Sequence, residues 1–221
     1  MEFLTAPYTA PLLIALTLVF AVREIATYRG QLRLKYLFTP MVTALIAGFA
    51  ILSIIESGPT PYRVLILAAL ILSLIADTML MVVEVNLMQH GIIYFMLAHV
   101  MYSIAFSLGY SYRSWNLIAA GVLLLIFALF YRRIRGSVGD FRIPLLVYAV
   151  LLGAMLFFSL SSLNRMASCT AALIITGGVM FVISDFLLAY LTFVKQHKRQ
   201  SVIVWAFYAP AQLMLALSCF G

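Results

Sequence analysis

The amino-acid sequence predicts an all-α, polytopic membrane protein with about eight transmembrane helices. Of its 221 residues, 65% are hydrophobic and only 10% are charged, and the mean hydropathy is +1.12. A soluble domain averages nearer half apolar and about a quarter charged residues. Apolar runs of roughly 20 residues, the length that crosses a bilayer as a helix, recur along the whole chain. Since no hydrophilic stretch is long enough for a soluble domain, we expect one transmembrane domain over residues 1–221.

The apolar runs, and the turn signals between them, place the individual spans. Short clusters such as SGPTP at 57–61 and GSVGD at 136–140 separate neighbouring runs. Trp115 and Trp205 lie near span ends, which is typical of interfacial tryptophans. The expected spans cover residues 7–28, 36–55, 62–84, 91–110, 115–132, 143–163, 168–192 and 200–219.

The net charge of +7 indicates membrane topology rather than a nucleic-acid partner. Only Arg63, Arg113 and Arg165 lie on one side of the predicted spans. By the positive-inside rule, the richer side is cytoplasmic and both termini face away from it. The expected location is the inner membrane of a bacterium. The other eleven of the fourteen basic residues lie around the first, fifth and seventh connections: Arg23, Arg29, Arg33, Lys35, Arg132, Arg133, Arg135, Arg142, Lys195, Lys198 and Arg199.

Three ionisable side chains inside the apolar spans are candidates for a functional site. Asp77 lies in SLIADTMLMV of the third span, Asp185 in VISD of the seventh, and His99 about halfway along the fourth. A carboxylate at mid-bilayer costs at least about 2.5–3.5 kcal/mol, so such residues usually face an interior cavity. At about 1.5 Å per residue, all three fall near the middle or in the cytoplasmic half. This convergence predicts one shared site nearer the cytoplasmic side.

Five further polar residues accompany these three by helical spacing. They are Tyr102, one turn after the histidine; Tyr148 in the sixth span; Ser184, beside the second aspartate; and Tyr208 with Gln212, one turn apart in the eighth. Such a cavity is more polar than helix packing requires. The alternative interpretation is structural, because buried acids, histidines and phenols also serve as interhelical hydrogen-bonding groups.

Lys35, at the start of the second span, has two interpretations. Its long side chain can extend to lipid phosphates at the membrane surface, or it can reach the headgroup of a substrate. We favour the first, since Lys35 lies among other basic residues at a predicted membrane boundary.

A short internal similarity raises the possibility of duplication. LIAD at 74–77 resembles VISD at 182–185, and leucines follow both strings. The two spans have the same predicted orientation, which fits a parallel four-plus-four repeat. Two short apolar strings that share an aspartate can also match by chance, so both explanations stay open.

Metal and serine-hydrolase chemistry find little support. A zinc site needs three or four His, Cys, Asp or Glu ligands, and only one histidine lies inside a predicted span. Cys169 and Cys219 match neither a metal-ligand spacing nor a disulfide framework. No serine lies in a G-x-S-x-G string. The paired carboxylates are therefore the strongest chemical feature.

Five strings in order resemble the YhhN-like membrane family, the lysoplasmalogenases. One departure is Ala76, where the family often has glycine before the first aspartate. The resemblance implies hydrolysis of the vinyl ether bond of lysoplasmalogens to a fatty aldehyde and glycerophospho-ethanolamine or -choline, without metal or organic cofactor. The strings are SLIADTMLM at 73–81, GIIYFMLAHVMY at 91–102, residues 144–155 with Tyr148, GVMFVISD at 178–185 and YAPAQ at 208–212.

The implied reaction suits a pair of acids. A vinyl ether hydrolyses by protonation of its β-carbon, which leaves an oxocarbenium ion, and glycosidases handle a similar cation with two carboxyl groups. We hypothesise that Asp77 and Asp185 form this catalytic pair, without assigning the proton donor. The histidine, Tyr148, Tyr208 and Gln212 would orient water or bind glycerol and phosphate oxygens. The expected partners are a lysophospholipid substrate and the bilayer, and the oligomeric state is left open.

Three other functions use similar residues. A proton-coupled small-molecule or lipid transporter also needs intramembrane acids, although these spans have few central Gly or Pro interruptions. An intramembrane aspartyl protease uses two aspartates, but here they follow Ala76 and Ser184 instead of that class's tyrosine and glycine. A lipid-binding protein without turnover is the third.

Overall fold

The computed structural model describes residues 8–82, 85, 87–164 and 166–221. This described part of the chain is helical throughout, with short connections and no strand. Three short 3-10 helices, η2 (Gly139–Phe141), η3 (Ser162–Asn164) and η4 (Ser218–Phe220), adjoin the long ones. The long helices are α1 (Thr9–Tyr28), α2 (Leu32–Ser57), α3 (Pro61–Met81), α4 (Met88–Ser107), α5 (Trp115–Ile134), α6 (Arg142–Ser161), α7 (Ser168–Phe193) and α8 (Gln200–Leu217).

All eight helices are long and apolar enough to cross a membrane. Large apolar side chains on their outer faces, such as Ile55, Leu124 and Ile143, are more than 70% exposed. Exposure of that kind suits a lipid environment, where the outside of a bundle is as apolar as its inside. The chain is an integral membrane protein, and the predicted all-α class is confirmed.

The predicted spans match the helices to within a few residues. The second helix begins at Leu32, four residues before the predicted 36, because its first turn takes in the basic residues of the connection. The third ends at Met81, where Val82 becomes extended, and its predicted last two residues lie outside the described ones. Arg165, one of the basic residues used for topology, also lies outside the described residues.

Local signals explain how the first three helices begin and end. Thr60 caps α3, since its hydroxyl accepts a hydrogen bond from the Arg63 amide at 3.2 Å, and Pro61 takes the first helical position, where no amide donor is needed. The turns on either side of α2 contain Gly30 and Gly58, both with positive φ. Glycine adopts this conformation without steric cost.

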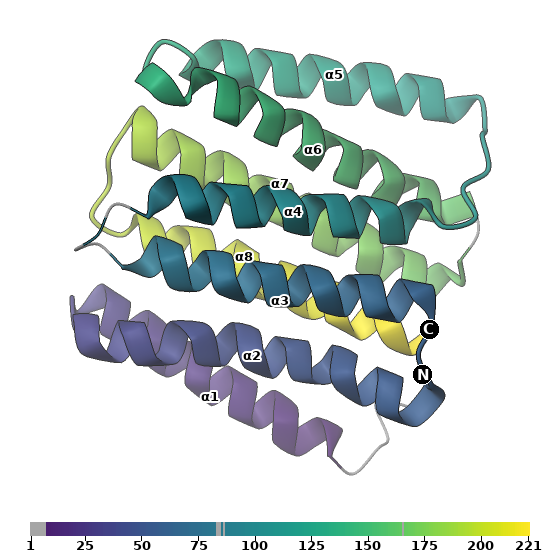
Figure 1. Ribbon diagram of the computed structural model, residues 1–221, viewed down its shortest axis with the longest axis horizontal. Coiled ribbons are helices and arrows are strands. Elements are labelled where there is room, and N and C mark those ends of the chain that lie inside the picture. Colours follow the sequence, from purple (N-terminus) through teal and green to yellow (C-terminus); the bar gives the residue numbers. More distant parts are fainter. Residues whose placement is uncertain (1–7, 83–84, 86, 165) are drawn as a thin grey trace.

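The helices run up and down, so α1 begins and α8 ends at the same end of the bundle (Figure 1). The α1–α2, α3–α4, α5–α6 and α7–α8 connections lie together at the opposite end. We call this the basic end, because the connections rich in Lys and Arg belong to it.

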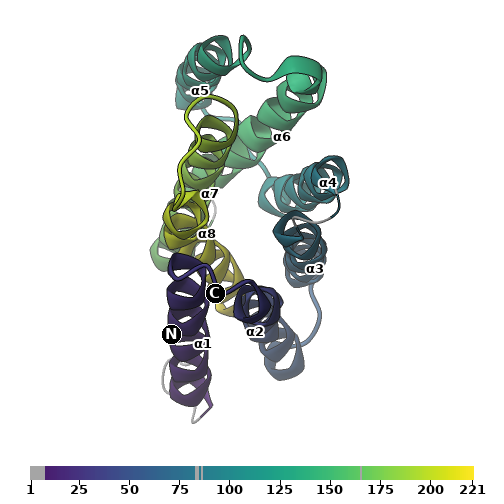
Figure 2. The same cartoon turned by 90° about the vertical axis from the view of Figure 1, so that its left-hand side faces the viewer.

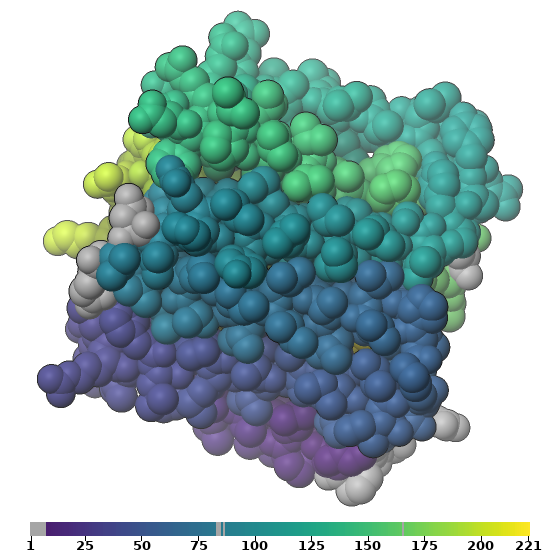
Figure 3. All heavy atoms as spheres, viewed as in Figure 1, coloured from purple at the N-terminus to yellow at the C-terminus, as the bar shows by residue number. Residues whose placement is uncertain are grey.

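Neighbouring helices pack in a consistent order. The α3–α4 and α7–α8 pairs pack closely, α2 contacts both α1 and α3, and α5 contacts α6 and α7. In Figure 2, α7 and α8 lie beside the α2–α4 layer, on the same side as α1, and Figure 3 shows the face on the α2–α4 side, where α5 and α6 also appear. This arrangement does not establish the four-plus-four repeat, which stays a prediction.

Close contact between α7 and α8 depends on Gly177. A Cβ atom at this position would lie 2.8 Å from Leu215 Cδ2 and 3.1 Å from the Ala211 carbonyl oxygen. Small residues let helix backbones approach in this way. The contact sets the spacing between the helix of Asp185 and the helix of Tyr208.

Candidate active site

Asp77 lies one turn before α3 ends, and its carboxylate is buried among three helices. Its Oδ2 atom accepts hydrogen bonds from Thr43 Oγ1 of α2 at 2.7 Å and from the Tyr208 hydroxyl of α8 at 2.8 Å. Two donors on one oxygen compensate much of the cost of burying a charge.

A relay of hydrogen bonds extends from Asp77 into the core. Gln212 Nε2 donates to the Tyr208 hydroxyl oxygen at 2.9 Å, and the Tyr102 hydroxyl donates to Gln212 Oε1. Each group donates toward Asp77, which is the final acceptor. Tyr102 and Gln212 are fully buried. They orient the Tyr208 hydroxyl from the protein core.

Asp185 lies about two turns before α7 ends and has different partners. The Tyr148 hydroxyl of α6 donates to its Oδ2 atom at 2.7 Å. His99 Nε2 of α4 lies 3.0 Å from the Tyr148 hydroxyl and 3.4 Å from Asp185 Oδ2. Phe181 packs edge-on against the imidazole at 5.0 Å between ring centroids and helps to hold it. The three polar groups form one compact cluster.

Both carboxylates line one cavity of about 180 Å³, which we call the acid cavity. Ser184 also lines it, and its buried Oγ atom has no hydrogen-bond partner within the described residues. Side chains from α1, α2, α3, α4, α7 and α8 form the walls. The two acids therefore face one shared space.

A second cavity of about 180 Å³, which we call the apolar chamber, adjoins the acid cavity. Residues of α3, α4, α5, α6 and α7 form most of its walls. Asp185, Tyr148, Thr192 and Gln200 are polar residues of its walls, and most of the rest is aliphatic or aromatic. Leu80, Phe95 and Leu188 line both cavities, so they separate the two spaces. Asp185 lies at this boundary, whereas Asp77 faces the acid cavity alone.

A polar pocket of about 410 Å³ adjoins the acid cavity at the basic end. Its walls come from the α1–α2 and α7–α8 connections, with His197 and Lys198 among them. Lys35, Gln200 and Ser201 line both this basic-end pocket and the acid cavity. The three spaces adjoin one another: Gln200 lines all of them, and Thr192 lines both the polar pocket and the apolar chamber.

The nine residues singled out from the sequence fall into two groups. Four line the acid cavity beside Asp77: Lys35, Ser184, Asp185 and Tyr208. Tyr148 faces the apolar chamber. The remaining three are buried supports: His99 and Gln212 hydrogen-bond to Tyr148 and Tyr208, which line the cavities, and Tyr102 hydrogen-bonds to Gln212.

Sequence reasoning missed one wall residue of the acid cavity and one hydrogen-bond partner of Asp77, and it misjudged another wall residue. Arg23 was used only to assign topology, yet it is buried in α1 and lines the acid cavity. Its position inside the first predicted span could have identified it as a candidate site residue. Thr43 carried no signal, because threonines are common in membrane helices. The prediction of Trp205 as an interfacial residue is wrong: it is 8% exposed. The Arg23 guanidinium stacks on the Trp205 ring, with the guanidinium carbon 4.0 Å from the ring centroid.

In the described part of the chain, no group of three or more His, Cys, Asp or Glu side chains is placed to hold a metal ion. The arrangement offers proton transfer and charge stabilisation instead. Two carboxylates and the Tyr208 phenol line the acid cavity, and Tyr148 lines the adjoining apolar chamber, with His99 behind it.

The model of the YhhN family matches residues 34–219. The chain belongs to the YhhN family. The match includes both acids and the whole of α3 to α8, whereas α1, with Arg23, precedes it. No solved structure matches this chain.

Proposed function

We propose that this YhhN-family protein is a membrane hydrolase that cleaves the vinyl ether bond of lysoplasmalogens. Water is consumed, and the products are a fatty aldehyde and glycerophospho-ethanolamine or -choline. The observation that carries the proposal is the placement of two buried carboxylates on one cavity, with an apolar chamber beside one of them. Family membership supports the same class of reaction.

The adjoining polar and apolar spaces suit a lysophospholipid. Its alkenyl chain would occupy the apolar chamber, its vinyl ether would lie at the boundary near Asp185, and its glycerol would lie in the acid cavity near Asp77. An amphipathic substrate needs this order of apolar and polar surroundings. A lipid substrate also explains why the acids lie within membrane-spanning helices.

In the first step, Asp185 donates its proton to the β-carbon of the vinyl ether. That carbon belongs to the alkenyl chain, and Asp185 is the acid that borders the apolar chamber. The double bond supplies the electron pair for the new C–H bond, and an oxocarbenium ion forms between the α-carbon and the ether oxygen. Tyr148 and His99 hold the carboxyl group in place.

In the second step, Asp77 stabilises the cation and directs water to the α-carbon. Hydrogen bonds from Thr43 and Tyr208 fix the position of its carboxylate. The carboxylate therefore does not have to move as the cation forms. The proton lost by the attacking water restores the acid. The hemiacetal then breaks its bond to the glycerol oxygen, which takes a proton, and the aldehyde leaves.

Aldehyde release by purified protein in detergent tests the proposal. We expect the wild type to release aldehyde from an alkenyl lysophosphatidylethanolamine, and in D₂O to place one deuterium on the carbon next to the aldehyde. Asp77→Asn and Asp185→Asn should each abolish most turnover, whereas Asp140→Asn, an exposed acid in η2, should not. Folded wild type that releases no aldehyde contradicts the proposal, and proton-coupled lipid transport in proteoliposomes then becomes the function to test.

A further inference from the structure

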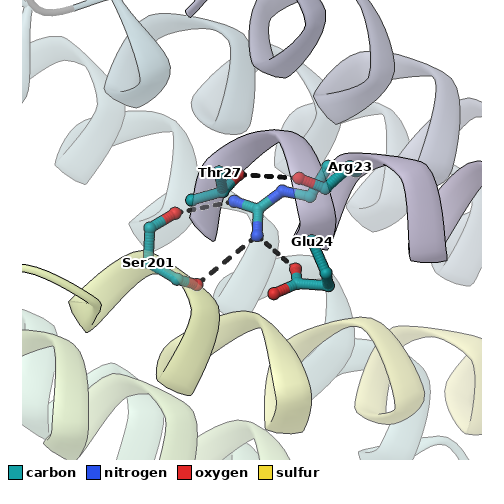
Figure 4. A network of polar contacts seen from close by, with 4 residues as sticks. All are labelled: Arg23, Glu24, Thr27 and Ser201. Atoms are coloured by element: carbon teal, nitrogen blue, oxygen red, sulfur yellow. Dashed lines mark hydrogen bonds and ion pairs between the residues drawn. The ribbon is translucent and has the colours of Figure 1, made fainter. Parts of the chain in front are cut away.

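Arg23 is the largest fully buried side chain in the described part of the protein, with 1% of its surface exposed. Its Nη2 atom donates to Ser201 Oγ of α8 at 2.7 Å, and Nη1 pairs with Glu24 (Figure 4). The guanidinium stacks on Trp205 at 4.0 Å. These contacts fix its position between α1 and α8.

The contacts leave part of the guanidinium unused. Arg23 Nε is buried and has no hydrogen-bond partner among the described residues, and the side chain lines the acid cavity. A buried donor of a charged group is costly to leave unpaired. If Arg23 only joined two helices, a hydrogen bond to Nε would stabilise the protein further. The unpaired Nε therefore points to a ligand that enters the cavity.

A second cation lies along the same route. Lys35 of α2 lines both the acid cavity and the basic-end pocket, as do Gln200 and Ser201. Arginine presents a planar set of donors that matches phosphate oxygens, and lysine adds a point charge on a flexible stem. Lys35 therefore lies where the polar pocket adjoins the acid cavity, and Arg23 lies in the wall of the acid cavity.

We propose that Arg23 and Lys35 form a phosphate subsite, which holds the phosphodiester of a lysophospholipid headgroup at the basic end of the acid cavity. Glu24 is a positioning residue, since it orients the guanidinium and leaves the cavity to Arg23 and Lys35. The inference deepens the proposed function and rests on it for the identity of the lipid. It also assigns a role to α1, which precedes the segment matched by the family model.

Substrate selectivity is the first test. The wild type and Arg23→Gln would be compared on an alkenyl lysophosphatidylethanolamine and on the corresponding alkenylglycerol, which has the same vinyl ether but no phosphate. We expect kcat/KM for the phospholipid to fall roughly 10- to 100-fold, the value of hydrogen bonds to a charged group, and that for alkenylglycerol to change little. Lys35→Met should show the same selectivity with a smaller loss.

Two further variants separate binding from folding. Arg23→Lys keeps the charge and should keep most of the preference for the phospholipid. Arg33→Gln removes an exposed cation two residues before Lys35 and should change neither substrate. Equal losses on both substrates in Arg23→Gln would mean that Arg23 only joins α1 to α8, and no loss on either would also overturn the subsite.

Binding without turnover is the second test. Trp205 packs against Arg23, and the chain contains two tryptophans, so a Trp115→Phe background makes Trp205 the sole indole reporter. We expect its fluorescence to respond to a saturated alkyl lysophosphatidylethanolamine, which cannot be cleaved, and not to the matching alkylglycerol. Glycerol 3-phosphate and inorganic phosphate distinguish a lipid headgroup from a free phosphate as the ligand.

These outcomes separate the two proposals. Phosphate-dependent binding with no aldehyde from the wild type retains the subsite and removes the hydrolase. Aldehyde release with equal effects of Arg23→Gln on both substrates retains the hydrolase and removes the subsite. A fluorescence response equal for the phospholipid and the alkylglycerol also removes it.

Discussion

The two acids of the cavity are chemically identical but have different surroundings. Asp77 receives two hydroxyl donors on one oxygen and ends a relay that begins in the core. Asp185 receives the Tyr148 hydroxyl, lies 3.4 Å from His99 Nε2, and borders the apolar chamber. Asp77 is thus held by hydroxyl donors from two other helices, whereas Asp185 lies beside an apolar space.

This difference suggests how one cavity can carry two roles. A carboxyl group that must donate a proton to carbon has to lie beside the chain that contains that carbon, and Asp185 is in that place. A carboxylate that stabilises a cation needs rigid support, which Asp77 has from α2 and α8. Environment separates the functions of two like groups, as in other paired-acid enzymes.

The largest expected effects come from removing each acid. Asp185→Asn should lower kcat by roughly 10³- to 10⁴-fold, because it removes the proton donor, and Asp77→Asn by about 10²- to 10³-fold, because it removes charge stabilisation. Single-turnover aldehyde assays measure both, with the exposed Asp140→Asn as control. A solvent isotope effect that persists in Asp77→Asn supports the assignment, and a larger loss in Asp77→Asn than in Asp185→Asn would reverse it.

The tyrosines test the two surroundings one at a time. Tyr148→Phe should cost roughly 10- to 100-fold in kcat, since it removes the hydroxyl that donates to Asp185 and contacts His99. Tyr208→Phe should cost about tenfold or less, because Thr43 still donates to Asp77. The measurement is kcat in the two single variants and the double variant. Effects that multiply indicate separate clusters, and strong non-additivity would mean that the two acids share one network.

The apolar chamber belongs to the Asp185 side, so filling it should affect chain preference more than chemistry. Ala189→Leu should lower kcat/KM for long alkenyl chains several-fold and spare short ones, because it adds volume inside a cavity that Ala189 lines. Competition between substrates of different chain length measures this ratio. Ala154→Leu is the matched control, since Ala154 lines a separate groove between α5 and α6. An unchanged ratio in Ala189→Leu would place the chain elsewhere.

The smallest expected effect concerns the spacing between the helices of the two clusters. Gly177→Ala should lower the free energy of unfolding by about 1–2 kcal/mol, because its Cβ would overlap Leu215 and approach the Ala211 carbonyl. Gly121→Ala of α5 is the matched control: nothing lies within 4 Å of its Cβ position, so we expect a neutral or slightly stabilising change. Thermal unfolding in detergent measures both. Equal behaviour of the two variants would show that α7 and α8 tolerate a wider separation.

Much of the fold could be predicted from the sequence, because membrane-spanning helices are local. Each needs about 20 apolar residues and satisfies its own backbone hydrogen bonds, so the eight helices and most of their ends were predicted. Asp77, Asp185 and His99 were found for a related reason, since an ionisable group in an apolar run is costly wherever the helix packs. The convergence of the acids followed from their similar depth.

Helical periodicity tells which residues of one helix share a face, but not which helix that face meets. Thr43 became a partner of Asp77 only because α2 packs beside α3. Tyr148 and His99 met at Asp185 because α4, α6 and α7 come together there. The acid residues, the spans and the membrane class are properties of the sequence itself. The difference between the two acids, and the place of Arg23 beside them, were decided by tertiary packing, which brings together side chains that no sequence spacing relates.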